Sequence, residues 1–225
     1  WRTVNGDVVQ HASGALDIEL GGRDAGAAHD QLACGGNLLL DGSLNVTRLR
    51  GFVPSNGDSF VIASSLSLSG QFATTNLPPW FAWSLQYLGG PLVLTVTGVE
   101  TATNGVPKAW LADHGWTNNF DAAATNDADG DRVATWEEYF AGTDPTNGAS
   151  FFQCLELSRT NLPTPGKVLR WNAVSGRVYA VESSTDSLLK AWTELTNNLP
   201  APINSCTDAA PDPANIQYRL RVGPP

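Results

Sequence analysis

The stretch IQYRLRV, residues 216–222, alternates apolar and polar side chains more regularly than any other part of this 225-residue chain. Successive side chains of a β-strand point to opposite faces, so a period of two marks a strand with one buried face. The residues expected on the buried face are Ile216, Tyr218, Leu220 and Val222. The stretch predicts a half-buried strand and favours a β fold for the end of the chain.

The region around this strand has the same character. KVLRWNAV, residues 167–174, and RVYAVESS, residues 177–184, are rich in β-branched and aromatic residues. The stretch 198–215 is rich in Pro, Asn and Asp, which is typical of a long loop. We therefore predict a C-terminal antiparallel β-sandwich over residues 149–225.

Residues 1–99 also read as strands and turns. LDIEL, residues 16–20, alternates, and PLVLTVTGV, residues 91–99, is rich in β-branched residues. Two short apolar runs flank Asp41-Gly42, which predicts either a hairpin-type turn or a β-arc. The sequence predicts an all-β N-terminal domain, and its periodicity leaves the topology open.

Residues 100–148 change character. Pro107 fits the first turn of a helix, where its missing N–H costs nothing. TWEEYFAG, residues 135–142, reads as a second short helix, with Thr135 as N-cap and Gly142 as C-cap. An acidic loop lies between them, so we predict a helix–loop–helix connector.

The acidic loop, NDADGDRVATWEE (residues 126–138), has the spacing of an EF-hand-like calcium loop. Calcium needs six to eight hard oxygen ligands, and alternate short carboxylates in a tight turn supply several at one point. Position 6 of such a loop is normally Gly, and here it is Arg132, with Gly130 at position 4. The predicted ligands are Asp127, Asp129, Asp131, the Val133 carbonyl, Thr135 and bidentate Glu138, with Asp144 completing the shell or capping the next turn. The competing interpretations are a solvated acidic turn, a magnesium site or a catalytic carboxylate pair.

Composition limits the class of partner. The chain has 22 Asp and Glu against 13 Lys and Arg, a net charge of −9. This balance argues against nucleic acid and anionic lipid, which attract basic surfaces. No run of 18 apolar residues is present to span a membrane. The chain opens at Trp1 without Met, so we expect a processed protein or a piece of a longer one, and a mature secreted protein would have lost its signal peptide.

The three cysteines are Cys34, Cys154 and Cys206, and none forms a C-x-x-C pair. We predict a disulfide between Cys154 and Cys206 within the C-terminal module, which indicates an oxidising compartment and leaves Cys34 single. Buried or free thiols are the alternative.

Three parts of the chain resemble known protein families. The phrases between residues 14 and 78 are similar to the last rungs of autotransporter or adhesin-type surface proteins, which implies a β-helix end or a β-sandwich capping one. They are Gly14–Gly21, Asp30–Gly36, Gly42–Val46, Gly57–Ile62 and Gly70–Pro78. The acidic loop resembles thrombospondin type 3-like and dockerin-like calcium repeats, which carry Gly where this chain has Arg132. The pattern Trp171, Val174, 176–186 and Trp192 resembles a C-terminal module of secreted proteins from Verrucomicrobia-like bacteria.

These features predict a secreted or cell-surface protein that is not an enzyme. The chain has three histidines without metal-pair spacing and no G-x-S-x-G motif. We expect a calcium-stabilised structural protein, a subunit of a surface fibre or layer that associates with itself or with other surface proteins. The alternative is an accessory adhesion or carbohydrate-binding module in which Trp80 and Trp83 stack on a glycan, against the interpretation of both as core residues.

Overall fold

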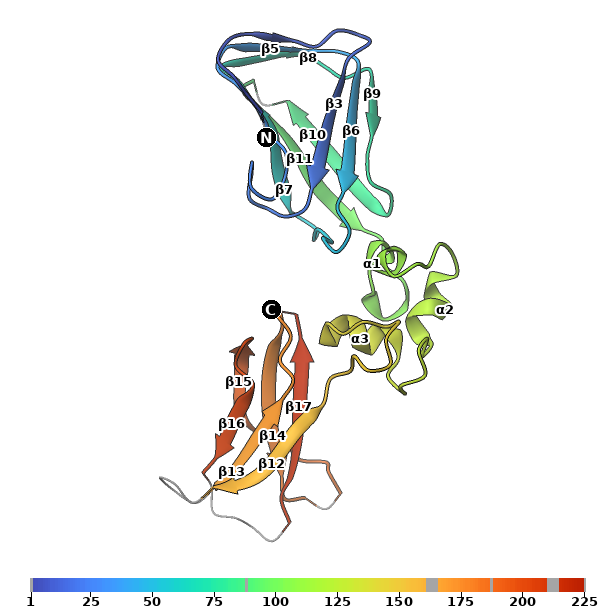
Figure 1. The fold of residues 1–225 in the computed structure, drawn as a ribbon, viewed down its shortest axis with the longest axis vertical. Helices are drawn as coiled ribbons and strands as arrows, with labels where there is room; N and C mark the ends of the chain where they lie inside the picture. The colour runs from blue at the N-terminus through green and yellow to red at the C-terminus, as the bar shows by residue number, and fades with distance from the viewer. Residues whose placement is uncertain (1, 88, 161–165, 187, 210–214, 225) are drawn as a thin grey trace. The chain divides into compact units, whose positions relative to one another are not determined.

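The computed structural model describes residues 2–87, 89–160, 166–186, 188–209 and 215–224. Internal contacts divide the chain into two compact units, residues 1–120 and 121–225. Both units are built mainly of β-strands, as predicted (Figure 1). The boundary between them falls inside the region predicted as a connector.

The first unit is a parallel β-helix of three turns, in which each turn gives one strand to each of three sheets (Figure 1). Paired residues lie 28 positions apart for Ala15 and Ser43 and 31 apart for Leu32 and Ala63. The β-helix end is therefore the correct one of the two N-terminal alternatives. The turns are β1 (Arg2–Val4), β2 (Val8–Val9) and β3 (Ala15–Leu20); β4 (Leu32–Cys34), β5 (Asn37–Leu40) and β6 (Ser43–Arg48); and β7 (Ser59–Ser64), β8 (Ser67–Gly70) and β9 (Thr74–Asn76).

The corner at Asp41-Gly42 shows why the sequence coils in this way. It joins β5 to β6, which lie in different sheets, so it is a β-arc and not a hairpin. Gly42 has φ +69°, and a Cβ at this position would collide with the carbonyl oxygen of Gly14 in the turn below. Only glycine fits both requirements. Leu38 and Leu40 then point into the core while Leu39 faces solvent.

The end of the β-helix after the third turn is closed by a hairpin, β10 (Phe81–Tyr87) and β11 (Pro91–Val99). Strand β11 pairs antiparallel with β7, so the sheet has the order β1-β4-β7-β11-β10. Buried residues of β7 and β11 form much of the core at this end. They are Phe60, Ile62, Leu92, Leu94 and Val96.

A short helical segment follows, η1 (Thr103–Gly105) and α1 (Lys108–Asp113). Arg48 of β6 pairs with Asp113 at 2.7 Å, and the two side chains are only 10% and 11% exposed. Arg48 also donates to the carbonyl oxygen of Ala109 at 3.2 Å. These contacts attach α1 to the β-helix.

Helix α2 (Phe120–Thr125) begins at the last residue of the first unit. The second unit holds the rest of α2, α3 (Thr135–Ala141) and an antiparallel β-sandwich. Its sheets have the orders β12-β13-β16 and β15-β14-β17, and their strands run antiparallel, as predicted. Tyr218, Leu220 and Val222 pack on the core and the alternating polar residues face solvent, which confirms the prediction for residues 217–222. Ile216, the fourth residue expected on the buried face, precedes β17 and is half-buried. The strands are β12 (Cys154–Thr160), β13 (Gly166–Trp171), β14 (Val178–Ser184), β15 (Thr193–Pro200), β16 (Ser205–Asp208) and β17 (Gln217–Gly223).

The disulfide predicted between Cys154 and Cys206 is not formed, and all three cysteines are free thiols. Cys154 lies on β12 opposite Trp171, and Cys206 lies on β16 opposite Leu169. Strand β13 separates them, so their backbones are about two strand spacings, roughly 10 Å, apart. A disulfide needs Cα atoms within roughly 7 Å. Among the residues described, no helix is long and apolar enough to cross a membrane.

Candidate metal centre

The acidic loop lies between α2 and α3. Carboxylate oxygens of Asp127, Asp129 and Asp131 lie within 4.8 Å of one another, so the sequence spacing does bring these three groups together. Three like charges at this separation repel one another unless a cation or protons neutralise them. The loop therefore has the donor atoms and the crowding of a cation site.

Backbone N–H groups hold the loop in its tight turn. Gly130 and Arg132 donate to the two carboxylate oxygens of Asp127 at 2.7 and 2.8 Å. The bond from Arg132, followed by that from Gly130, lowers the pKa of Asp127 below its usual value. Both donors have positive φ, +85° for Gly130 and +77° for Arg132. Arg132 thus adopts the left-handed conformation for which calcium loops normally use Gly.

Glu138 enters the site from α3 and is completely buried. Its Oε1 accepts a hydrogen bond from the Thr143 hydroxyl at 3.1 Å. Its Oε2 is buried without a hydrogen-bond partner, and so are the Oδ2 atoms of Asp129 and Asp131. A buried carboxylate oxygen normally has a hydrogen-bond donor, because leaving it unpaired costs roughly 1–3 kcal/mol. Glu138 is near enough to Asp129 and Asp131 for their charges to act on it, but its carboxylate is not among the three that converge within 4.8 Å. Unpaired oxygens of this kind are accounted for if they ligate an ion.

The electrostatics of the site lead to the same result. Burial first, and then the charges of Asp129, Asp131 and Asp144, raise the pKa of Glu138 to about 7. The hydrogen bond from Thr143 opposes this shift without cancelling it. The carboxylate of Glu138 therefore faces other carboxylates, and a divalent cation among them would reverse the sign of its surroundings.

The remaining predicted ligands lie in the same segment. Val133 donates its N–H to Asp131 Oδ1 at 2.8 Å. Thr135 is buried, and its hydroxyl donates to the carbonyl oxygen of Asn126 at 3.0 Å, which ties the start of the loop to α3. Thr135 is the first residue of α3 and the N-cap is Ala134, one residue earlier than expected. The C-cap is Gly142, as predicted, with φ +77°.

Asp144 lies in the turn that follows α3. Its Oδ1 accepts from the N–H and the hydroxyl of Thr146 at 3.0 and 2.7 Å. The same turn returns to the acidic loop, since a Cβ at Gly148 would lie 3.4 Å from the carbonyl oxygen of Asp129. Asp144 thus stabilises this turn by its hydrogen bonds, and its negative charge acts on Glu138.

Sequence reasoning missed two residues that support Glu138. Thr143 donates to its carboxylate, and Arg177 of the sandwich donates to the carbonyl oxygens of Tyr139 and Phe140 at 2.7 and 2.8 Å. The Arg177 guanidinium lies close beside Gly142, where a Cβ would be 3.0 Å from Nε. Gly142 therefore has two reasons to be glycine, but no pattern in the sequence links it to a residue 35 positions later.

The two tryptophans considered as a glycan platform have different surroundings. Trp83 packs against the β-helix core, and its indole N–H donates to the Pro78 carbonyl oxygen at 3.1 Å. Trp80 has φ +66° and meets Phe120 edge to face, with ring centroids 5.7 Å apart. Trp80 also borders a groove of about 370 Å³ on the β-helix surface. Trp83 thus packs, partly buried, against the core, and Trp80 lies at a groove.

Comparison with known proteins leaves the site to be interpreted on its own geometry. No family model matches the chain, and no curated protein matches it. The resemblances drawn from the sequence motifs therefore remain resemblances.

Proposed function

We propose that the acidic loop binds a single calcium ion that stabilises the second unit. The observation that carries this proposal is the fully buried carboxylate of Glu138, whose Oε2 has no hydrogen-bond partner beside the Asp127–Asp131 cluster. Asp127, Asp129, Asp131 and Glu138 would hold the ion, together with the Val133 carbonyl. Thr135 and Asp144 would not contact the ion. They would hold the loop and the turn after α3 in place through the hydrogen bonds that they already make.

Calcium fits this set of donors better than magnesium. Four carboxylates with a backbone carbonyl form an oxygen-rich protein cage, which calcium accepts at variable geometry. Magnesium demands a small octahedral shell and keeps several of its waters. The non-glycine residue at position 132 stores strain in the loop and carries a positive charge, and both features favour weak binding. We expect a dissociation constant in the range of extracellular modules, about 10⁻⁴–10⁻³ M.

Calorimetric titration of the full chain tests the calcium site. We expect one calcium per chain and at least tenfold weaker binding of magnesium. Glu138→Gln should abolish calcium binding, because it removes the buried bidentate ligand. The matched control is Glu137→Gln, which changes the neighbouring exposed carboxylate and should leave the affinity unchanged. Equal affinities of the two variants would contradict the proposal.

For the whole chain, we propose a non-catalytic structural role outside the cell, in a surface fibre or layer. A weak calcium site is filled at the millimolar calcium of an extracellular medium. The strands at the edges of their sheets at one end of the β-helix give a surface suited to association with copies of the chain or with other surface proteins. Electron microscopy of native material in millimolar calcium, repeated after chelation, tests this role. Filaments that fray on chelation support it, and isolated particles under both conditions contradict it.

The alternative is a carbohydrate-binding accessory module. The groove beside Trp80 is also lined by the side chains of Asn45 and Asn76, and amides beside an aromatic ring can orient a sugar. Trp83 does not contribute, since it packs on the core. Glycan-array binding that is lost in Trp80→Ala and kept in Trp80→Phe would favour this function over the structural one.

A further inference from the structure

The two ends of the β-helix differ. At the end formed by the first turn, β1, β2 and β3 each lie at the edge of their sheet. In β3 the N–H and C=O of Glu19 already bond to Asp30 at 3.1 and 3.0 Å, so the open part of that edge is the part before Glu19. At the other end, β11 pairs antiparallel with β7, and the β10–β11 hairpin extends that sheet. An edge strand presents a row of backbone N–H and C=O groups that can pair with a further strand. The first-turn end is the one where three parallel sheets can continue together.

Inward-pointing residues of the first turn are less buried than their partners in the second turn. In the second turn, Leu38 and Leu44 are completely buried. Their partners in the first turn are Val8 and Leu16, which point in the same direction but are only partly buried. The first turn thus repeats these two inward-pointing apolar positions of the second turn, but they are less well covered.

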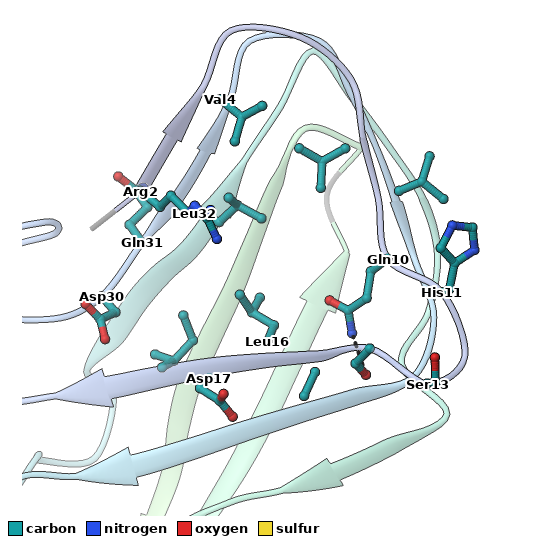
Figure 2. Close-up of a pocket in the computed structure, with 15 residues that line it drawn as sticks. Arg2, Val4, Gln10, His11, Ser13, Leu16, Asp17, Asp30, Gln31 and Leu32 are labelled. Carbon is teal, nitrogen blue, oxygen red and sulfur yellow. Dashed lines mark hydrogen bonds between the residues drawn. The ribbon is translucent and has the colours of Figure 1, made fainter.

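A cavity of about 750 Å³ opens at this end. Figure 2 shows Val4, Leu16 and Leu32 among the side chains that line it, with Gln10 at the corner. Gln10 donates from Nε2 to the carbonyl oxygens of Asp41 at 2.6 Å and Ser43 at 3.1 Å, so it fixes the corner of the turn while lining the cavity. Apolar side chains of the first two turns therefore reach the surface here, beside polar side chains such as Arg2 and Asp30 that line the same cavity.

A ladder of polar side chains on the outside of the third sheet also ends here. Asn76 donates from Nδ2 to Asn45 Oδ1, and Asn45 donates from Nδ2 to Asp17 Oδ1, both at 2.7 Å. Asp17 is exposed and ends the ladder, and an ionised carboxylate can only accept. The next position in this ladder calls for a side chain that donates, such as Asn.

We propose that the first-turn end docks a further turn of parallel β-helix, supplied by a polypeptide segment outside residues 1–225. This turn would pair with β1, β2 and β3, cover Val8 and Leu16 with apolar side chains, and place a donor over Asp17. It would repeat an interface that already occurs twice within the chain, between the first and second turns and between the second and third turns. The proposal deepens the structural role proposed above by naming its docking surface and partner.

A second copy of the chain does not meet these requirements. Two copies joined through these edges by a two-fold axis would bring their strands together antiparallel, whereas each of these sheets stacks in parallel. A head-to-tail arrangement would need a free parallel end on the other copy. That end carries the β10–β11 hairpin.

The test adds a turn to the intact chain. A second copy of residues 1–30, with Asp17→Asn in the added copy, is fused before residue 1, so that it has the 30-residue spacing of the Arg2–Leu32 and Val8–Leu38 pairs. Hydrogen exchange is measured by mass spectrometry. We expect the edge amides of the original β3 that precede Glu19 to exchange at least tenfold more slowly than in the 225-residue chain, since Glu19 already donates its N–H to Asp30. The matched control carries Val8→Asp and Leu16→Asp in the added copy alone, and it should lose the protection.

Two results would overturn the proposal. One is equal exchange of the original β3 in the extended chain and its control, with near-ultraviolet circular dichroism confirming that both are folded. The other is a concentration-dependent dimer of the unextended chain, detected by sedimentation and abolished by Leu16→Asp, because the occupant would then be a second copy. Neither measurement depends on calcium, so failure here and failure of the calcium site can be told apart.

Discussion

Arg177 donates a hydrogen bond from Nε to the carbonyl oxygen of Phe140 at 2.8 Å. A second bond, from Nη2, reaches the carbonyl oxygen of Tyr139 at 2.7 Å. A guanidinium at a helix C-terminus satisfies orphan carbonyl groups and complements the helix dipole. Because Glu138 precedes these two residues on α3, the sandwich and the candidate metal centre share one short helix.

Arg177→Gln should therefore weaken calcium binding without touching a ligand. The loss of two charge-assisted hydrogen bonds should lower the stability of the second unit by about 2 kcal/mol. Calcium affinity should fall by about fivefold or more, since coupling between sites is reciprocal. Calorimetry and thermal unfolding measure the two effects. The matched control is Arg170→Gln, which breaks an exposed pair with Glu156 and should change both by little. Unchanged calcium affinity in Arg177→Gln would contradict the coupling.

The buried carboxylate of Glu138 predicts an unusual pH dependence in chelator. Its pKa of about 7 in the folded protein lies above the ordinary value of 4.5. The folded state then binds the proton more tightly than the unfolded state, so stability is greatest below pH 4.5 and falls as pH rises through about 7. We expect the melting temperature of the second unit in chelator to fall from pH 5 to pH 8.

Glu138→Gln separates the charge from the ion. In chelator at pH 8 the variant should be more stable than the parent protein, because it no longer buries an unpaired charge. In millimolar calcium the order should reverse, because the parent gains binding energy and the variant does not. Thermal melts under the two conditions decide the matter. If the parent is the more stable protein under both conditions, the charge is stabilised in some other way.

The partly buried pair Arg48–Asp113 should make the first unit sensitive to acid. Burial raises the pKa of Asp113, but hydrogen bonds from Arg48 and the N–H of Gly51 outweigh it, so the pKa is lowered from 3.8. The pair stabilises the fold above pH 3.8, and this contribution is lost as pH falls through the lower folded pKa. Asp113→Asn should cost about 3 kcal/mol by leaving Arg48 without its anion. Hydrogen exchange of β6 at pH 7 measures the loss. Glu100→Gln, in the exposed pair with Lys108, is the control and should cost under about 1 kcal/mol.

Local patterns were sufficient for features set by neighbouring residues. The alternation in residues 216–222 gave the buried face of β17, and the spacing of Asp127, Asp129 and Asp131 gave their convergence. Gly142 ended α3 as expected, because a left-handed C-cap is a property of the glycine itself.

Features that depend on the order of strands could not be predicted in the same way. Alternation shows which face of a strand is buried but not which strand lies beside it, so Cys154 and Cys206 were paired across an intervening strand. Arg48 and Asp113 are 65 positions apart, and nothing local links them. Arg177 was placed only in the predicted strand 177–184, although its guanidinium donates to the carbonyl oxygen of Phe140, 37 positions earlier in the chain.

Arg132 offers the sharpest test of the loop. Its φ of +77° places a residue with a Cβ where glycine is favoured, and its positive charge lies in an anionic loop. Arg132→Gly should relieve the strain and remove the charge, so the second unit should gain up to about 1 kcal/mol and bind calcium more tightly. Arg132→Ala removes only the charge and Arg132→Lys removes neither, which separates the two effects. Calcium affinity should rise from Lys to Ala and again from Ala to Gly. Equal affinities of the Ala and Gly variants would show that the left-handed conformation costs the site nothing, and the affinity would then be set by charge alone.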